Sequence, residues 1–234
     1  MSKMNITPIG KITTPFSEKF TIPRQAQIVK QAWGKLEFIG DYRHTDSLNG
    51  LSAHSHYWLI WGFNLHTDKD KTLTVRPPRL GGNQRVGVFS TRSPFRPNNL
   101  GLSVVKLEQI DTDSFSVIFS GVDMLSGTPI YDIKPYIPYA DNRPDAVSDW
   151  ANNPPEKPFM VTFLPEVEQQ LSVYDKHYGV NLLALVRELL AYDPRPAYKK
   201  GKIDNKIYAT TLYDVDIAWQ IADNSVTVIS AKIS

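Results

Sequence analysis

The sequence predicts a mainly β protein, with an N-terminal all-β barrel followed by a small C-terminal α+β domain. Three observations support this fold class. Short strand-like stretches bounded by Gly, Pro, Asn and Asp fill roughly the first 140 residues, where helical periodicity is nearly absent. Two amphipathic stretches with helical spacing follow only after Pro158. No G-x-G-x-x-G follows a strand, and the strand–helix alternation of a dinucleotide-binding fold is missing.

The N-terminal part reads as a series of short strands joined by turns. Asp111 and Asp113 predict a hairpin turn, because Asp side chains hydrogen-bond to nearby backbone. The apolar run from Tyr57 to Trp61 indicates a strand buried on both faces or a contact between protomers, and the core is favoured. The predicted strands are Gly34–Ile39, Tyr57–Leu65, Thr72–Val75, Arg85–Ser90, Leu102–Ile110 and Ser114–Ser120.

Prolines then separate two domains. We expect a barrel domain over residues 1–140, a linker at 141–158 that contains four prolines, and an α+β domain over 159–234. In the last, Glu166–Tyr178 and Leu182–Tyr192 are predicted helices, and Asn181 is expected to cap the second. The predicted strands that follow are Ile207–Leu212, Asp216–Ile221 and Val226–Ile229.

Composition excludes several classes of protein. The chain has no cysteine, which removes disulfides, a thiol nucleophile and thiolate zinc sites. No apolar run approaches the roughly 20 residues of a membrane-spanning helix, and the first residues lack the apolar core of a signal peptide. We therefore expect a cytoplasmic protein with no membrane association.

The net charge of +2 conceals a local asymmetry. Between Lys71 and Lys106 there are seven basic residues and no acidic ones, whereas the other 19 basic residues face all 24 acidic residues. The rest of the chain therefore carries a formal charge of −5. Such a stretch favours an anionic partner such as RNA, although a solvated basic face is the simpler alternative.

Within this stretch, residues 87–101 carry the most unusual motif. Pro94 and Pro97 restrict the backbone and exclude a regular helix, so the loop should present Arg92 and Arg96 in fixed directions, with Asn98 nearby. A planar guanidinium is suited to bidentate contact with carboxylate or phosphate and to stacking on a base. The alternative is a basic turn that forms surface salt bridges.

A second cluster follows the turn at Ser126 and Gly127. Asp132, Lys134 and Tyr136 alternate along a predicted strand, and we expect all three to point into the barrel. As a hypothesis, Asp132 accepts a proton from a nitrogen nucleophile and Lys134 or Tyr136 supports it. The structural alternative is a satisfied Asp132–Lys134 pair.

Two imidazoles, His54 and His56, share one face of a strand, which is the minimum for a metal site. No third ligand is visible nearby in the sequence. No metal site is predicted.

The two motifs, together with Ile22–Gln25 and the Asp193–Tyr198 element, resemble the TrmO family (TsaA-like, also called YaeB or VirR) over essentially the whole chain. The resemblance implies a methyltransferase built on a β-barrel, outside the Rossmann class. It also implies that S-adenosylmethionine methylates N6 of threonylcarbamoyladenosine next to the anticodon of a threonine tRNA. A homodimer with the cofactor near the protomer interface is implied as well.

By the same resemblance, a defined set of residues would surround the cofactor. By their chemistry, Asp123 suits the ammonium group or a ribose hydroxyl, Arg92 the carboxylate, and Gln25 the adenine edge. At Asn64 and Leu65 many relatives carry a His-Gln pair instead. The implied cofactor-binding residues are Pro23, Arg24, Gln25, Asn64, Leu65, Arg92, Leu102, Val122, Asp123, Met124 and Leu125.

The tail element contributes candidate tRNA contacts. Asp193, Arg195 and Tyr198 precede Lys199, Lys200 and Lys202, and an aromatic beside basic residues suits an RNA loop. The alternative is a helix stop followed by solvated lysines. Arg96 and Asn98 complete the candidate substrate-binding set. Two other functions stay open: a non-catalytic RNA-binding barrel, and a methyltransferase that uses the same cofactor on a small molecule.

Overall fold

The computed structural model describes residues 4–65, 71–195 and 206–233. The chain forms two compact units, each assembled from separate segments. The first unit comprises residues 1–13, 34–120 and 126–152, and the second comprises 14–33, 121–125 and 153–234.

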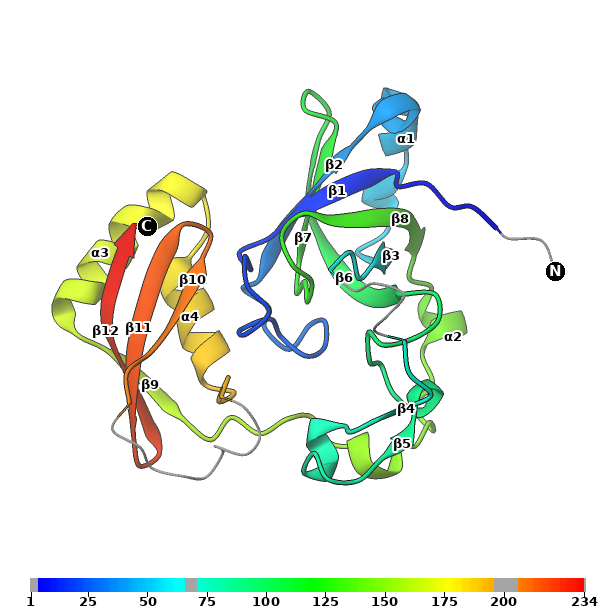
Figure 1. Cartoon of the computed structure of the whole chain (residues 1–234). Helices are drawn as coiled ribbons and strands as arrows, with labels where there is room; N and C mark the ends of the chain where they lie inside the picture. The colour runs from blue at the N-terminus through cyan, green and yellow to red at the C-terminus, as the bar shows by residue number, and fades with distance from the viewer. Residues whose placement is uncertain (1–3, 66–70, 196–205, 234) are drawn as a thin grey trace. The chain divides into compact units, whose positions relative to one another are not determined.

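The first unit is built around a closed barrel, as the sequence predicts (Figure 1). Its strands are paired in the order β1-β2-β7-β6-β3-β8, and β8 pairs back with β1 to close the ring. All of these pairs are antiparallel. The strands are β1 (Gly10–Thr13), β2 (Trp33–Phe38), β3 (His56–Gly62), β6 (Leu100–Asp111), β7 (Ser116–Ser120) and β8 (Thr128–Pro135). The sequence did not predict β1, which has only four residues.

Strand β3 shows how the barrel core is formed. Tyr57, Leu59 and Trp61 are buried, whereas Trp58 and Ile60 between them are only half-buried, as expected where alternate side chains face the core. The apolar run is therefore a core strand with one partly open face. It ends at Gly62, three residues before the predicted end.

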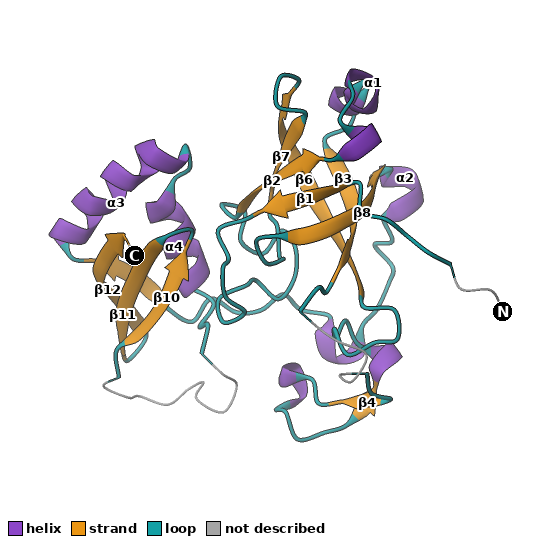
Figure 2. Cartoon of the chain, turned by 45° about the horizontal axis from the view of Figure 1, so that its top comes forward, coloured by secondary structure: helices purple, strands orange, loops and turns teal. Residues whose placement is uncertain are grey.

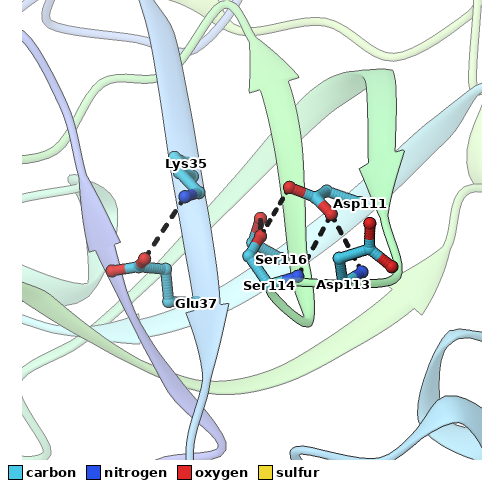
Figure 3. A network of polar contacts seen from close by, with 6 residues as sticks. All are labelled: Lys35, Glu37, Asp111, Asp113, Ser114 and Ser116. Carbon is cyan, nitrogen blue, oxygen red and sulfur yellow. Dashed lines mark hydrogen bonds and ion pairs between the residues drawn. The ribbon is translucent and has the colours of Figure 1, made fainter.

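The turn between β6 and β7 confirms the predicted hairpin (Figure 3). The Asp111 carboxylate accepts hydrogen bonds from the backbone N–H groups of Asp113 and Ser114 at 3.0 and 3.1 Å, and from the Ser114 hydroxyl at 2.6 Å. These bonds, the hydroxyl first, lower the pKa of Asp111 because they stabilise its charged form. On β2 nearby, Lys35 pairs with Glu37 at 3.3 Å.

An excursion joins β3 to β6 and contains most of the basic stretch. It holds the short antiparallel pair β4 (Thr74–Val75) and β5 (Val86–Gly87), labelled in Figure 1. The strands predicted at 72–75 and 85–90 are thus shorter than expected, and Val88–Ser90 forms a 3-10 turn instead. The α-helices of the first unit are single turns, α1 (Thr45–Leu48) and α2 (Pro138–Asp141).

The second unit contains the predicted α+β fold. Its sheet has the order β10-β11-β12-β9, with β9 parallel to β12, and α3 packs on β12 while α4 packs on β9. Figure 2 shows both helices beside the sheet. The helices α3 (Pro165–Tyr178) and α4 (Leu182–Leu190) confirm the prediction, and the Asn181 side chain caps α4 by accepting a hydrogen bond from the Ala184 N–H at 2.8 Å. The strands are β9 (Met160–Phe163), β10 (Tyr208–Leu212), β11 (Val215–Ala222) and β12 (Ser225–Ile233); β9 was not predicted.

The second unit also includes two segments that come from between barrel strands. Residues 14–33 follow β1, and residues 121–125 follow β7, yet both cluster with the C-terminal part of the chain. Phe16 forms a bridge with Leu212 of β10, and both side chains are buried. The expected division at 1–140, 141–158 and 159–234 did not anticipate these two segments.

Candidate functional site

The loop that precedes β6 holds its own conformation through hydrogen bonds. One terminal nitrogen of Arg96 donates to the carbonyl oxygens of Thr91 and Ser93 at 2.9 and 3.2 Å. The Thr91 hydroxyl donates to the Val88 carbonyl at 2.8 Å. Arg96 is therefore half-buried and holds the loop together, whereas Arg92 and Asn98 are exposed.

The surrounding excursion is basic and also exposes large apolar side chains. Leu73 and Phe89 are 84% and 74% exposed. Arg76, Arg79, Arg85 and Arg92 are all exposed as well. Arginines interspersed with an open aromatic ring can bind phosphates and stack on a base.

Asp132 and Lys134 share one face of β8, but the prediction that they point into the barrel is wrong. Their side chains are 49% and 64% exposed and form an ion pair at 3.6 Å. The reason is a β-bulge between Ile130 and Asp132, which shifts the alternation by one residue. Ile130 lies opposite Trp61 and is buried, whereas Asp132 lies opposite half-buried Ile60.

The outer face of β3 and β8 joins these polar groups to aromatic ones. The Tyr136 ring lies 5.9 Å from the Trp58 ring, and the Trp58 indole N–H donates to Asp141 at 3.1 Å. The backbone N–H of Ile137, followed by the Trp58 indole, lowers the pKa of Asp141 because both donate to its charged form. The sequence analysis did not identify Trp58 or Asp141. The alternation along residues 57–61 places Trp58 on the face of its strand that points away from the core.

Some of the expected cofactor-binding residues come together within the second unit. The Gln27 N–H donates to the Gly121 carbonyl at 2.9 Å, and the Val122 N–H donates to the Ala32 carbonyl at 3.1 Å. These bonds connect the segment containing Pro23, Arg24 and Gln25 to the segment 122–125. A Cβ on Gly121, whose φ is +75°, would lie 2.5 Å from the Gln27 side chain, so this approach depends on glycine.

The side chains of these residues differ in exposure. Val122 and Met124 are buried and Pro23 is buried too, so their side chains belong to the core. Gln25, Asp123 and Leu125 are half-buried, and Arg24 is exposed. The polar members thus lie at the surface of the second unit, where an amide, a carboxylate and a guanidinium are partly open.

The other expected cofactor-binding residues belong to the first unit. Asn64 and Leu65 lie in the turn after β3 and not at a strand end, and Leu65 is 55% exposed. Leu102 of β6, opposite Ile60 of β3, is also 55% exposed. Leu102 therefore extends the outer face that carries Trp58 and Ile60.

Asp193 and Arg195 occupy a place that the sequence did not suggest. Their side chains are only 4% and 2% exposed, and two guanidinium nitrogens of Arg195 donate to the two Asp193 oxygens at 2.8 and 2.9 Å. Arg195 also lies 5.5 Å from the Phe159 ring, and hydrogen bonding to Asp193 raises its pKa. This geometry supports a structural role for the pair and gives no support to direct RNA contact. Tyr198, Lys199, Lys200 and Lys202 lie outside the described residues.

Within the described residues, no group of three or more His, Asp or Glu side chains is arranged to hold a metal ion; His54 lies near Tyr57, and His56 is hydrogen-bonded to Ser55. Across residues 4–65, 71–195 and 206–233, no helix has the length and apolar character needed to cross a membrane.

Family models and known proteins match the chain along nearly its full length. The family model "tRNA-methyltransferase O N-terminal domain" matches residues 11–142, and "TrmO C-terminal domain" matches residues 156–233. The chain is 44% identical to the tRNA (adenine(37)-N6)-methyltransferase of Escherichia coli K12 over 95% of each sequence. It is 40% identical to a putative S-adenosylmethionine-dependent methyltransferase, RcsF, of Pseudomonas aeruginosa over 92% of this chain and 91% of that protein.

Solved structures agree with these sequence matches. A crystal structure of TrmO from Pseudomonas aeruginosa superposes with a TM-score of 0.83 at 31% identity, covering 99% of both chains. A second crystal structure of TrmO gives 0.83 at 33% identity, with 98% of this chain and 99% of the other covered. Because both family models match in order and the fold agrees over both units, the chain belongs to the TrmO family.

Proposed function

We propose that the chain is an S-adenosylmethionine-dependent tRNA (adenine-N6)-methyltransferase. It acts on N6 of threonylcarbamoyladenosine at position 37, next to the anticodon of a threonine tRNA. The observation that carries this function is membership of the TrmO family along both parts of the chain, including 44% identity to the Escherichia coli enzyme. The closed antiparallel barrel in place of a doubly wound sheet is consistent with it.

The cofactor is proposed to bind through the residues inferred from the family. Half-buried Asp123 and Gln25 and the exposed Arg24 offer a carboxylate, an amide and a guanidinium, which suit the ammonium, adenine and carboxylate groups of S-adenosylmethionine. Arg92, exposed on the loop that precedes β6, is the residue predicted for that carboxylate, and Arg24 is an additional candidate. When bound, S-adenosylmethionine supplies an electrophilic methyl group on a sulfonium.

Residues of the chain are proposed to orient the nucleophile and remove its proton. The N6 nitrogen of the modified adenosine is urea-like, so a base is useful. The Asp132 side chain is 49% exposed, accepts a hydrogen bond from the Ile133 N–H at 2.9 Å and is paired with Lys134. We assign it the proton-accepting role, with Lys134 and Tyr136 supporting it. Solvent exposure makes Asp132 accessible to a macromolecular substrate, which an inward orientation would not.

The basic excursion is proposed to contact the tRNA. Its exposed arginines and Phe89 provide phosphate and base contacts, and Arg96 and Asn98 are further candidates from the same loop. Asp193, Arg195 and Tyr198 stay predicted tRNA contacts, for which the burial of the first two gives no support. Binding should weaken with rising salt, since it depends on neutralising phosphates.

We also propose a homodimer and a cytoplasmic location, where tRNA is modified. The half-buried Trp58 and Ile60 and the 55% exposed Leu102 form an apolar stripe across β3 and β6 that a second copy would cover. Light scattering of the protein and of Leu102→Lys tests this. A monomer of the unaltered protein would contradict the proposal.

Mass spectrometry of nucleosides tests the reaction. Threonine tRNA carrying threonylcarbamoyladenosine is incubated with the protein and S-adenosylmethionine, and a mass gain of one methyl group on that nucleoside is expected. Methylation of no RNA nucleoside, combined with cofactor binding in calorimetry, would favour a small-molecule methyltransferase. Absence of cofactor binding, alone and with tRNA, would favour a passive RNA-binding barrel.

The role of Asp132 has its own test. Asp132→Asn should lower turnover strongly while the affinity for S-adenosylmethionine is retained, because only the proton acceptor is lost. Glu37→Gln, another exposed carboxylate paired with a lysine two residues away, is the control. Unchanged turnover of Asp132→Asn would exclude this role.

A further inference from the structure

The segment 14–33 is fixed to the C-terminal part of the chain at its first half by β10. The Tyr213 N–H donates to the Pro15 carbonyl at 2.8 Å, next to the Phe16–Leu212 bridge. The hydroxyls of Thr21 and Thr210 lie 3.0 Å apart, and both residues are buried. The first half of the segment is therefore held in place as far as Thr21, two residues before Pro23.

Its second half is fixed by α4 and the residues just after it. The Gln31 N–H donates to the Glu188 carboxylate at 3.0 Å, and the Tyr192 hydroxyl donates to the Ile28 carbonyl at 3.2 Å. The segment has no regular secondary structure between Thr14 and Gln31 to satisfy these backbone groups. The Glu188 carboxylate and the Tyr192 hydroxyl therefore bond to backbone groups that a neighbouring strand would otherwise satisfy. The bond to the charged carboxylate is the stronger of the two.

The segment also contacts residues 121–125. The bonds from Gln27 to Gly121 and from Val122 to Ala32 are joined by a bond from the Thr14 hydroxyl to the Met124 carbonyl at 2.9 Å. The segment is thus hydrogen-bonded both to the C-terminal sheet and α4 and to residues 121–125. Pro23, Arg24 and Gln25 lie between the attachment points at Thr21 and Gln27.

We propose that Glu188 and Tyr192 are positioning residues for the cofactor site. Neither would touch the cofactor; they fix the backbone at Gln31 and Ile28 and so hold the segment that contains Arg24 and Gln25 beside residues 121–125. The C-terminal domain then takes part in cofactor binding, in addition to any contact with tRNA. The role rests on the proposed function, because that function assigns the cofactor to these residues.

The expected effect is on cofactor affinity. Glu188→Ala should raise the Kd for S-adenosylmethionine by about tenfold, equivalent to about 1.4 kcal/mol, because the Gln31 N–H loses its charged acceptor. Glu188→Gln keeps an acceptor oxygen and should restore most of the affinity. Tyr192→Phe keeps the ring and removes only the hydroxyl, and should raise the Kd by about threefold.

Matched controls separate positioning from general damage to the domain. Glu168→Ala removes a carboxylate of α3 that pairs at 3.8 Å with Arg187 of α4. Tyr174→Phe removes a phenol from the same helix. Both should bind the cofactor like the unaltered protein. Melting temperatures show which variants are folded, and Tyr192→Phe keeps the test valid should Glu188→Ala fail to fold.

Two readouts distinguish positioning from a structural role. In steady-state kinetics the KM for S-adenosylmethionine should rise while kcat at saturating cofactor stays unchanged. Hydrogen exchange of amides 22–31 should accelerate in Glu188→Ala while exchange in β11 and β12 does not. A kcat that falls with an unchanged KM, or acceleration throughout the domain, would overturn the inference.

Arg24→Ala and Asp123→Ala make the two proposals separable. If neither changes cofactor binding, the proposed cofactor site is wrong, whatever the positioning variants do. If both weaken binding while Glu188→Ala and Tyr192→Phe behave like their controls, the site stands and the positioning role is excluded.

Discussion

The buried pair of Asp193 and Arg195 makes a quantitative prediction about stability. In Asp193→Ala the guanidinium keeps its charge but loses the carboxylate that binds two of its nitrogens at 2.8 and 2.9 Å. Because the Arg195 side chain is only 2% exposed, water cannot replace the lost partner without opening the structure. Removing one member of a buried ion pair costs about 3–5 kcal/mol.

That cost should be visible as a lower melting temperature. For a chain of this size, each kcal/mol lowers the melting temperature by about 2–4 °C, so a fall of about 6–20 °C is expected. Differential scanning calorimetry of the variant measures it. The matched control is Glu37→Ala, which breaks the exposed pair with Lys35 and should cost less than about 1 kcal/mol, since both partners are already solvated.

The same experiment separates a structural role from the predicted RNA contact. A melting temperature of Asp193→Ala within about 1 °C of the unaltered protein would refute the reasoning from burial, because the charge would then be satisfied by solvent. If that outcome were accompanied by altered tRNA affinity, the predicted substrate contact would be supported instead.

Three further predictions follow from local geometry. Gly101→Ala should destabilise the barrel by about 1–3 kcal/mol, because the new Cβ would lie 2.2 Å from the Trp61 ring; chemical denaturation followed by tryptophan fluorescence checks it, and unchanged stability would contradict the packing. Asn181→Ala should cost about 1 kcal/mol in thermal denaturation through loss of the α4 cap, whereas Asn181→Asp should retain most of it. Burial raises the pKa of Tyr213 to about 12, so the protonated phenol contributes fully to the free energy of unfolding below pH 10, and this contribution is lost as the pH rises towards 12. In Tyr213→Phe, the free energy of unfolding measured by denaturation should therefore fall less steeply over this pH range. An equally steep fall in the variant would assign the pH dependence to other groups.

Much of the fold could be predicted because its signals are local. Asp111 uses its own side chain to close a turn, and Asn181 caps the helix that starts beside it, so neither depends on distant residues. The strand β9 escaped prediction because Met160–Phe163 is four residues long and gains its partner, β12, from more than 60 residues away. Short strands of this kind are specified by pairing and not by periodicity.

The candidate site was harder to predict than the fold. Because of a single bulge between Ile130 and Asp132, Asp132 and Lys134 lie on the face of the strand opposite to the predicted one. No residue type in that strand indicates a bulge. Charge was an equally poor guide to the exposure of Arg195. Its side chain is buried because it is paired with Asp193, two residues before it. The prolines predicted an irregular loop around Arg96, which the structure has, whereas the bonds from Arg96 to the Thr91 and Ser93 carbonyls were not predicted.

The polypeptide passes between its two units five times, after residues 13, 33, 120, 125 and 152, and this threading limits how the protein can be dissected. Cutting at the proline-rich stretch would leave Phe16, Val29, Ala32, Val122 and Met124 attached to the barrel fragment with their packing partners removed. Such a fragment would expose apolar surface and invite aggregation. Loss of tRNA methylation after truncation would then result from misfolding and would not show what the C-terminal half does. Point substitutions are therefore the appropriate way to test the function of the C-terminal half.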